Sequence, residues 1–122
     1  GIVHAIAHMV GAEYDTHHGL TNAIILPAVL RFNLPGMDEK VKRMNEAMQF
    51  EGNSAESFVS NIEKLLDRIN IPKGLGEIGV PEDCAERIAE KSMVDTAFGT
   101  NPRNASYDEM LELVRTSITQ AR

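Results

Sequence analysis

Apolar residues recur along the whole chain at the three- and four-residue spacing that is typical of helices. Residues 1–11 are small and apolar apart from two histidines, so we expect a buried helix there and a loop at 12–17. Residues 18–33 are also nearly all apolar, and the length of this segment favours a helix over a strand. Pro27 lies inside it and is expected to kink the helix or break it locally.

Later segments each carry one apolar face, as amphipathic helices do. The clearest stripe consists of Phe58, Val59, Ile62, Leu65, Leu66 and Ile69. Residues that favour a helix start precede these segments. They are Asp38, a capping box of Asn53 and Glu56, Pro81, and a second capping box of Ser106 and Glu109. Strand-like alternation is absent, so the pattern predicts an all-α bundle of about six helices in one domain, residues 1–122.

The connection at residues 70–80 contains Gly74, Gly76 and Gly79 but does not resemble a nucleotide-binding loop. The spacing of the glycines differs from the dinucleotide fingerprint, and no apolar strand precedes them. We therefore expect no phosphate-binding turn within this sequence.

Composition limits the kinds of partner that the protein can bind and indicates the redox environment in which it works. The formal net charge is -6 and no basic patch stands out, so nucleic acid is not expected to bind. The single cysteine, Cys84, excludes an internal disulfide and fits the reducing cytoplasm, and we expect it in the core. We find no signal peptide and no apolar run of membrane-spanning length.

The chain begins without Met and enters an apolar segment directly. This start predicts a longer protein, in which a further domain covers the helices at 1–11 and 18–33. Without that cover, both segments are expected to expose large apolar surfaces and to make the chain a homo-oligomer.

All four histidines lie within the stretch HAIAHMVGAEYDTHHG, from His4 to Gly19. His4 and His8 are four residues apart, so both lie on one face of a helix. A short loop between two antiparallel helices would bring His18 back beside them. Ala5 stands where a zincin has its general-base glutamate, so that motif is excluded.

The residues alone leave three interpretations of these histidines open. Histidines on an apolar helix face are most often core residues with one hydrogen bond. Alternatively, His4, His8 and His18 are the three ligands that a catalytic metal needs, and imidazoles suit iron(II), zinc, cobalt or nickel. In the third interpretation His4 and His18 are ligands, His8 faces the reacting centre, and further ligands come from elsewhere.

A longer motif runs from His4 to Asn33. It consists of His4-Ala5, His8, Gly11, Tyr14, His18-Gly19, Asn22-Ala23, Leu26-Pro27 and Arg31-Phe32-Asn33. This order resembles the signature of the iron-containing alcohol dehydrogenases, the metal-dependent group III family. LGEIGV at 75–80 and TNPR at 100–103 resemble later segments of the same family, so the resemblance covers essentially the whole chain.

The resemblance implies the all-helical C-terminal domain of such an enzyme, without its N-terminal dinucleotide-binding domain. It implies that His4 and His18 are metal ligands and that His8 is the catalytic histidine near the nicotinamide. The implied cofactors are a divalent metal, Fe2+ first and Zn2+ as the alternative, and NAD or NADP. The metal would act as a Lewis acid on a small alcohol or aldehyde. His17 departs from the family pattern, which often has proline there, and is expected at the surface.

Two ligands from one domain bind metal weakly, so we expect this chain to be inactive by itself. Two other functions remain open on the sequence. One is a free-standing helical module for binding or oligomerisation, and the other is a metal hydrolase that uses three histidines.

Several polar residues have no assigned chemistry. Four carboxylates are expected to face water: Glu63, Asp67, Glu86 and Glu90. Others are either motif members or simple helix ends and turns, namely Arg31, Asn33 and the Asn101-Pro102-Arg103 stretch.

Overall fold

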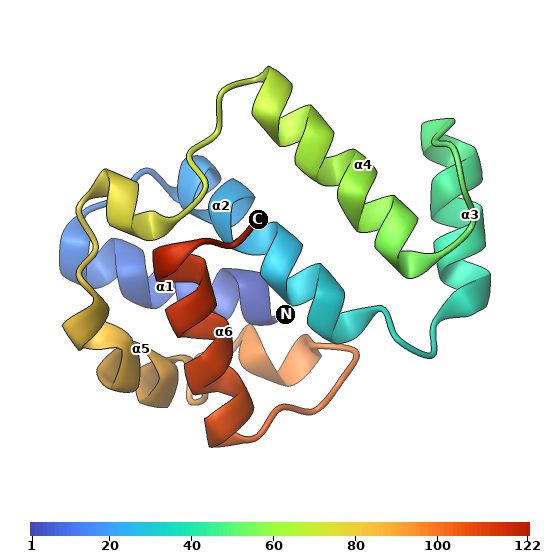
Figure 1. Cartoon of the computed structure of the whole chain (residues 1–122). Helices are drawn as coiled ribbons and strands as arrows, with labels where there is room; N and C mark the ends of the chain where they lie inside the picture. The colour runs from blue at the N-terminus through green and yellow to red at the C-terminus, as the bar shows by residue number, and fades with distance from the viewer.

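A computed structural model describes residues 1–122 as six α-helices with three short 3-10 turns. The helices are α1 (Ile2–Tyr14), α2 (His18–Asn33), α3 (Asp38–Met48), α4 (Ala55–Arg68), α5 (Ala85–Ser92) and α6 (Tyr107–Thr119). The turns are η1 (Leu75–Ile78), η2 (Glu82–Cys84) and η3 (Phe98–Thr100). Figure 1 shows α3 and α4 as a pair to one side of the other helices. The predicted all-α architecture is confirmed.

The main core lies between α1, α2, α5 and α6 and contains 19 buried apolar residues. Its largest fully buried members are Ile2, Ile6, Ile24, Ile25, Leu75, Ile88 and Met110. Cys84 is also fully buried, which confirms the core position expected for it. The interior of this bundle thus combines the mostly apolar helices α1 and α2 with the apolar faces of the amphipathic helices α5 and α6.

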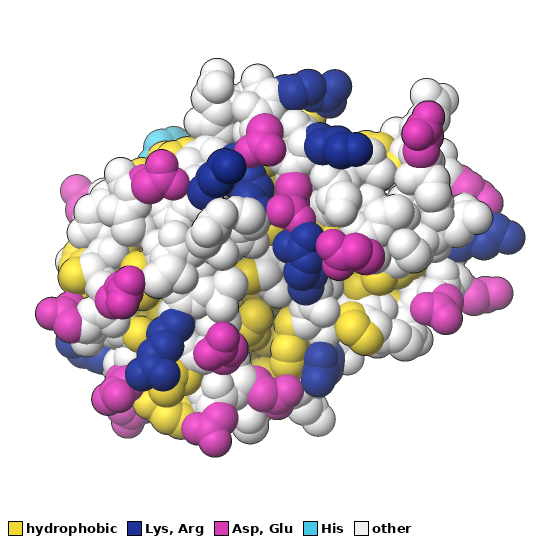
Figure 2. Space-filling model, viewed as in Figure 1, with side chains coloured by type: hydrophobic (Ala, Val, Ile, Leu, Met, Phe, Trp, Pro, Cys, Tyr) yellow, Lys and Arg dark blue, Asp and Glu magenta, His cyan; other side chains and the backbone are white.

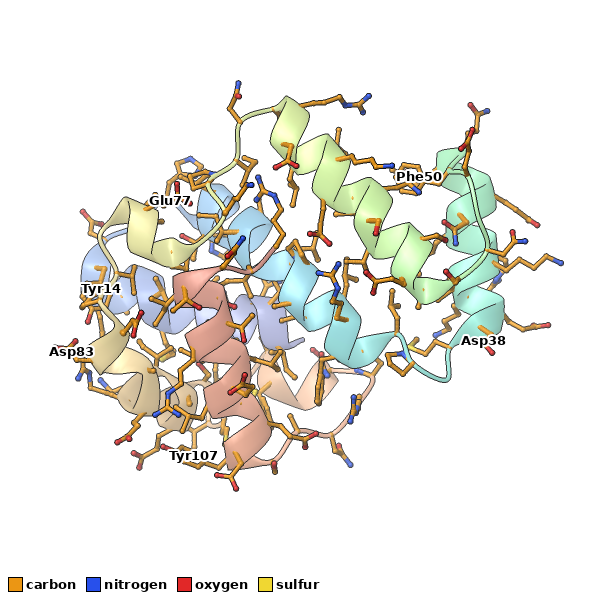
Figure 3. All side chains as sticks on the ribbon, in the orientation of Figure 1. Tyr14, Asp38, Phe50, Glu77, Asp83 and Tyr107 are labelled. Atoms are coloured by element: carbon orange, nitrogen blue, oxygen red, sulfur yellow. The ribbon has the colours of Figure 1, made fainter.

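A smaller cluster holds the α3–α4 pair against the end of α2. It consists of four buried residues, Leu34, Val41, Phe58 and Val59. Phe50, from the α3–α4 connection, packs on Phe58 with 5.7 Å between the ring centroids (Figure 3). The pair therefore has its own apolar contacts and lies against α2 at the end opposite His18.

The apolar surfaces expected to be exposed on the first two helices are largely covered within this chain. α1 packs against α2 and α5, and α2 also packs against α4 and α6, so their apolar sides face one another. The exposed large apolar side chains lie on other segments, at Met48, Ile69, Val94 and Tyr107. Ile69 thus falls outside the buried stripe predicted for α4, because it is the residue after the last helical turn.

Two helices differ in detail from the predicted start and stop signals. α2 continues through Pro27, so the local break that proline can cause does not occur. α3 has Met37 at its N-cap, without a side-chain hydrogen bond, and Asp38 is the first helical residue. Asp38 therefore acts through its charge near the positive end of the helix and not as a cap.

Two other helices begin with reciprocal capping boxes. The one predicted for α6 is confirmed, since Ser106 and Glu109 each accept the other's backbone N–H. The box of α4 lies one residue later than predicted, at Ser54 and Ser57. Pro81 precedes the 3-10 turn η2, so α5 begins only at Ala85.

Acidic and basic side chains are interspersed on the face shown in Figure 2. Glu86 and Glu90 are exposed, as expected. Glu63 is not: its side chain is only 18% exposed and pairs with Arg31, which also binds Glu56. Arg31 is thereby identified as a bridge between α2 and α4. None of the helices has the length and apolar character needed to cross a membrane.

The connection before η1 lies directly against α6. The Glu77 carboxylate closes this turn by accepting the N–H groups of Lys73 and Gly74 at 2.7 and 3.2 Å (Figure 3). A Cβ atom at Gly74 would lie 2.6 Å from the carbonyl oxygen of Ile118. This glycine is therefore required for close packing between two backbones.

We expect Gly74→Ala to lower the free energy of unfolding by about 1–3 kcal/mol, because the α6 backbone must shift to admit the methyl group. Urea unfolding followed by circular dichroism measures the change. Gly99→Ala is the matched control, since a Cβ there meets nothing within 4 Å, and it should cost less than about 0.5 kcal/mol. Equal costs for the two variants would contradict the packing role of Gly74.

Candidate functional site

Three histidines gather on one exposed edge of the α1–α2 hairpin. The loop 15–17 reverses the chain, so the first residue of α2, His18, returns beside α1. The ring centroids of His4, His8 and His18 lie 5.4 to 5.9 Å apart, and the rings of His8 and His18 are stacked. All three residues are exposed, so the interpretation as core histidines is wrong. The clustering predicted from their spacing is confirmed.

His17 has a different task from its neighbour. It is the N-cap of α2, and its Nδ1 accepts the backbone N–H of Leu20 at 3.3 Å. Its carbonyl accepts the hydroxyl of buried Thr21 at 2.8 Å. His18 therefore joins the cluster, and His17 caps the helix at the surface.

The hydrogen bond of His18 defines its tautomer. The amide nitrogen of Asn22 lies 3.1 Å from His18 Nε2. An amide nitrogen only donates, so Nε2 is the acceptor and the proton of the neutral ring is on Nδ1. The other end of this amide, Asn22 Oδ1, is buried and has no hydrogen-bond partner.

His8 contacts an acidic residue far along the chain. Its Nδ1 lies 3.1 Å from Oδ2 of Asp95, 87 residues away. The pKa of Asp95 is lowered, mainly because the Ala97 N–H donates to the same carboxylate, and His8 adds to the effect. The carboxylate therefore stays ionised and acts as an acceptor. Sequence reasoning missed Asp95 entirely.

The stretch after Asp95 holds the first turn of α1. Thr100 Oγ1 accepts from the amino group of Gly1 at 2.8 Å, and Asn101 Oδ1 accepts the Ile2 N–H at 3.2 Å. Asn101 also exchanges two hydrogen bonds with Asn33, at the end of α2. Gly1 has no side chain that could cap α1. Thr100, in η3, and Asn101, the next residue, therefore supply the acceptors for the start of this helix.

Arg103 completes this connection. Its guanidinium donates to the Phe32 carbonyl and stacks over the Phe32 ring at 3.9 Å from the centroid. The Asn101-Pro102-Arg103 stretch, left open between a motif and a simple turn, thus contacts the ends of both histidine-bearing helices. Asn33 belongs to the same set of contacts.

The opposite end of α1 is fixed by charge. The Glu13 carboxylate accepts hydrogen bonds from Arg87 at 2.9 and 3.0 Å and from Lys91 at 3.0 Å, both on α5. Arg87 lowers the pKa of Glu13 from 4.5 to about 2. Arg87 also donates to the Tyr14 hydroxyl at 3.2 Å. These bonds lie at the point where the chain leaves α1 for the loop before His18.

A largely apolar hollow of about 410 Å³ lies beside His4. Its walls come from the start of α1, the middle of α2, and Asn101 and Pro102. His4 and Asn22 supply polar groups at the side facing the histidines. The cluster therefore combines nitrogen donors with an adjoining apolar surface.

Comparison with known proteins assigns this domain to a family. The family described as "Fe-containing alcohol dehydrogenase family, C-terminal" matches residues 1–118. The chain belongs to the Fe-containing alcohol dehydrogenase family. The resemblance drawn from the histidine motif is therefore confirmed.

Several known enzymes resemble the chain over nearly its full length. Lactaldehyde reductase of Escherichia coli K12 is 35% identical over 123 residues, which cover 96% of this chain and 32% of that enzyme. The 1,3-propanediol dehydrogenase of Citrobacter freundii is 36% identical over 121 residues, which cover 94% and 31%. A crystal structure of a 1,3-propanediol oxidoreductase matches with a TM-score of 0.90 at 35% identity, covering 97% of this chain and 32% of that one. The chain spans about a third of the length of these relatives.

The donor chemistry of the cluster fits the metal that this family name implies. His4 and His18 present two imidazoles from two helices, and the lone pair of His18 Nε2 is held only by the Asn22 amide. Releasing it costs a single hydrogen bond. No set of three or more His, Cys, Asp or Glu side chains is arranged to hold a metal ion. Further ligands would have to come from outside this domain.

Asn101→Ala removes the acceptor of the Ile2 N–H and both bonds to Asn33. We expect the free energy of unfolding to fall by about 1–3 kcal/mol, because a partly buried donor and amide lose their partners. Chemical denaturation measures this loss. Asn104→Ala, at an exposed asparagine in the same connection, should change stability by less than about 0.5 kcal/mol. A loss of similar size in both variants would show that the Asn101 contacts do not stabilise the domain.

Glu13→Gln should destabilise the domain by about 1 kcal/mol at neutral pH, because Arg87 and Lys91 lose their carboxylate. The folded-state pKa of Glu13 is depressed from 4.5 to about 2, so its contribution is present above 4.5 and disappears as pH falls towards 2. Unfolding of both proteins in urea from about pH 7 to about pH 3 should therefore show the difference shrinking.

Glu90→Gln on the same helix is the control for this pH series. Glu90 is exposed and makes no hydrogen bond or ion pair, so its replacement should leave stability nearly unchanged. A Glu13→Gln effect that does not vary with pH would contradict the ion-pair explanation.

Proposed function

We propose that this chain is the metal-holding C-terminal domain of an NAD(P)-dependent alcohol dehydrogenase or aldehyde reductase. The convergence of His4, His8 and His18 on one exposed edge, in a member of the Fe-containing alcohol dehydrogenase family, carries this proposal. The printed names of the relatives support a small alcohol or aldehyde as substrate, since they include a lactaldehyde reductase and 1,3-propanediol dehydrogenases.

In this proposal His4 and His18 hold a divalent metal, Fe2+ in the first place and Zn2+ as the alternative. When bound, such an ion supplies Lewis-acid polarisation of a substrate oxygen. His8 is not a ligand in this proposal, which follows the family resemblance; its Nδ1 donates to Asp95. Its Nε2 remains available to accept a proton from the substrate or a water, or to contact the nicotinamide ring.

Both helices hold the three side chains in fixed positions. His4 and His8 stand one turn apart on α1, which is fixed at both ends by the bonds to residues 100–101 and to Arg87. His18 is fixed by its place in the first turn of α2, directly after the capping residue His17. A site on anchored helices holds its donors in place before any ligand arrives.

The domain at residues 1–122 supplies only part of the catalytic machinery in this proposal. The NAD or NADP site and the remaining metal ligands belong to a dinucleotide-binding domain that packs on the histidine edge. The chain alone is therefore expected to be inactive. A cytoplasmic location and a homo-oligomeric state remain predictions.

A free-standing oligomerisation module receives no specific support. The exposed large apolar side chains Met48, Ile69, Val94 and Tyr107 come from different segments and not from one helix face. The family membership and the histidine cluster favour the enzymatic proposal.

A chimaera tests the proposal. This chain replaces the corresponding third of Escherichia coli lactaldehyde reductase, with which it shares 35% identity. The chimaera should bind a divalent metal and show alcohol-dependent reduction of NAD or NADP. His4→Ala and His18→Ala should each reduce the metal content and lower activity at least about hundredfold, because each removes a proposed ligand.

His17→Ala is the matched control, since it removes a neighbouring exposed histidine that caps α2. It should retain metal and most of the activity. His8→Ala should retain metal but lose activity. Retention of metal by His18→Ala together with its loss in His17→Ala or His8→Ala would overturn the ligand assignment. A folded, metal-loaded chimaera without activity would overturn the proposed function.

A further inference from the structure

We infer that Asp95 is a positioning residue that holds the His8 imidazole in its Nδ1–H tautomer and fixes the orientation of the ring within the histidine cluster. The inference rests on the proposed function, because that proposal gives His8 a part in the reaction. It adds a residue from the far end of the chain to the site, and it assigns the nitrogen of His8 that is free to react.

The contact between the two side chains allows only one assignment of the proton. Oδ2 of Asp95 lies 3.1 Å from Nδ1 of His8. An ionised carboxylate accepts hydrogen bonds and never donates, so Nδ1 must carry the hydrogen. Neutral imidazole has a single N–H, and Nε2 is therefore left with a lone pair.

The carboxylate is itself held in place. The same oxygen, Oδ2, accepts the Ala97 N–H at 3.0 Å. The backbone of Asp95 also donates to the Ser92 carbonyl at 3.2 Å and accepts the Phe98 N–H at 3.1 Å. Asp95 is thus fixed by three backbone bonds before it contacts His8.

Burial strengthens this contact from one side. The Asp95 side chain is 13% exposed, whereas that of His8 is 42% exposed. A charge-assisted hydrogen bond to a largely shielded carboxylate is stronger than one in open water. The contact with Asp95 therefore restrains the His8 ring on its Nδ1 side, while the rest of the ring stays accessible to solvent.

A simpler role for Asp95 is to close the turn before η3 by accepting the Ala97 N–H. That role requires nothing of His8. The two possibilities differ in what they predict for the His8 ring, because only a positioning residue sets its tautomer.

His17 provides an internal reference for the opposite tautomer. Its Nδ1 accepts the Leu20 N–H at 3.3 Å, so the proton of its neutral ring must be on Nε2. One spectrum of the chain should therefore contain His8 and His17 in opposite tautomeric forms.

Long-range ¹H–¹⁵N correlation spectra of the ¹⁵N-histidine-labelled chain test the inference. They are recorded with EDTA at about pH 8, where ordinary imidazoles are neutral, and His8 is assigned by the loss of its signals in His8→Gln. We expect the Nδ1–H form of His8 to predominate and the Nε2–H form of His17 to predominate. A His8 ring that is mainly Nε2–H, or an even mixture, overturns the inference without any further variant.

Two substitutions separate positioning from turn closure. Asp95→Ala should lower the ratio of the Nδ1–H to the Nε2–H form of His8 at least about tenfold, because the acceptor is lost. Asp95→Asn keeps an oxygen that can accept from both Ala97 and His8, so the Nδ1–H form should remain the major one. A folded Asp95→Ala chain with an unchanged His8 ratio overturns the inference. If Asp95→Ala does not fold, the wild-type chain and Asp95→Asn decide.

The spectra contain neither metal nor cofactor, so this result is independent of the chimaera experiment. An active chimaera with His8 in the Nε2–H form would remove Asp95 from the mechanism and leave the proposed function intact. An inactive chimaera with His8 in the Nδ1–H form would overturn the proposed function. The pairing of His8 with Asp95 would then remain as a structural contact.

Discussion

The close packing of α1 against α2 and α5 is the interaction on which the rest of the structure depends. The helix buries Ile2, Ala5, Ile6, Ala7 and Val10, whose small or branched side chains let its neighbours approach. A helix with 3.6 residues per turn that buries these positions can present positions 4 and 8 only along its remaining edge. Packing forces, with no contribution from the histidines, therefore decide where two of the three imidazoles emerge.

Because α1 is buried along its length, the polar groups at its two ends take hydrogen-bond partners from other segments. Gly1 has no side chain to cap the helix, and the first N–H groups find their acceptors on Thr100 and Asn101. At the other end Glu13 is bound by Arg87. Apart from the contact of His8 with Asp95, the polar contacts that hold α1 thus lie at its two ends, and the histidines occupy the edge between them.

Local patterns in the sequence were sufficient for the helices and for the His4–His8–His18 cluster, because both depend on spacing within about 15 residues. They did not resolve the α4 cap, since Asn53 and Ser54 are both good capping residues and stand next to each other. The contacts of Asp95 and Asn101 could not be predicted for another reason. Their partners lie 87 and 99 residues away, and no periodicity connects such positions.

The same separation determines the order in which these parts can form. The α1–α2 hairpin needs only contacts that are close in sequence, and such contacts form early. The first turn of α1 obtains its acceptor only when Asn101 arrives from 99 residues downstream, and closing so long a loop costs more entropy. During synthesis, a growing chain that has reached α4 can therefore hold a paired hairpin while the start of α1 still frays. Completion of the histidine edge follows the docking of the last third of the chain, so full-length synthesis precedes a finished site.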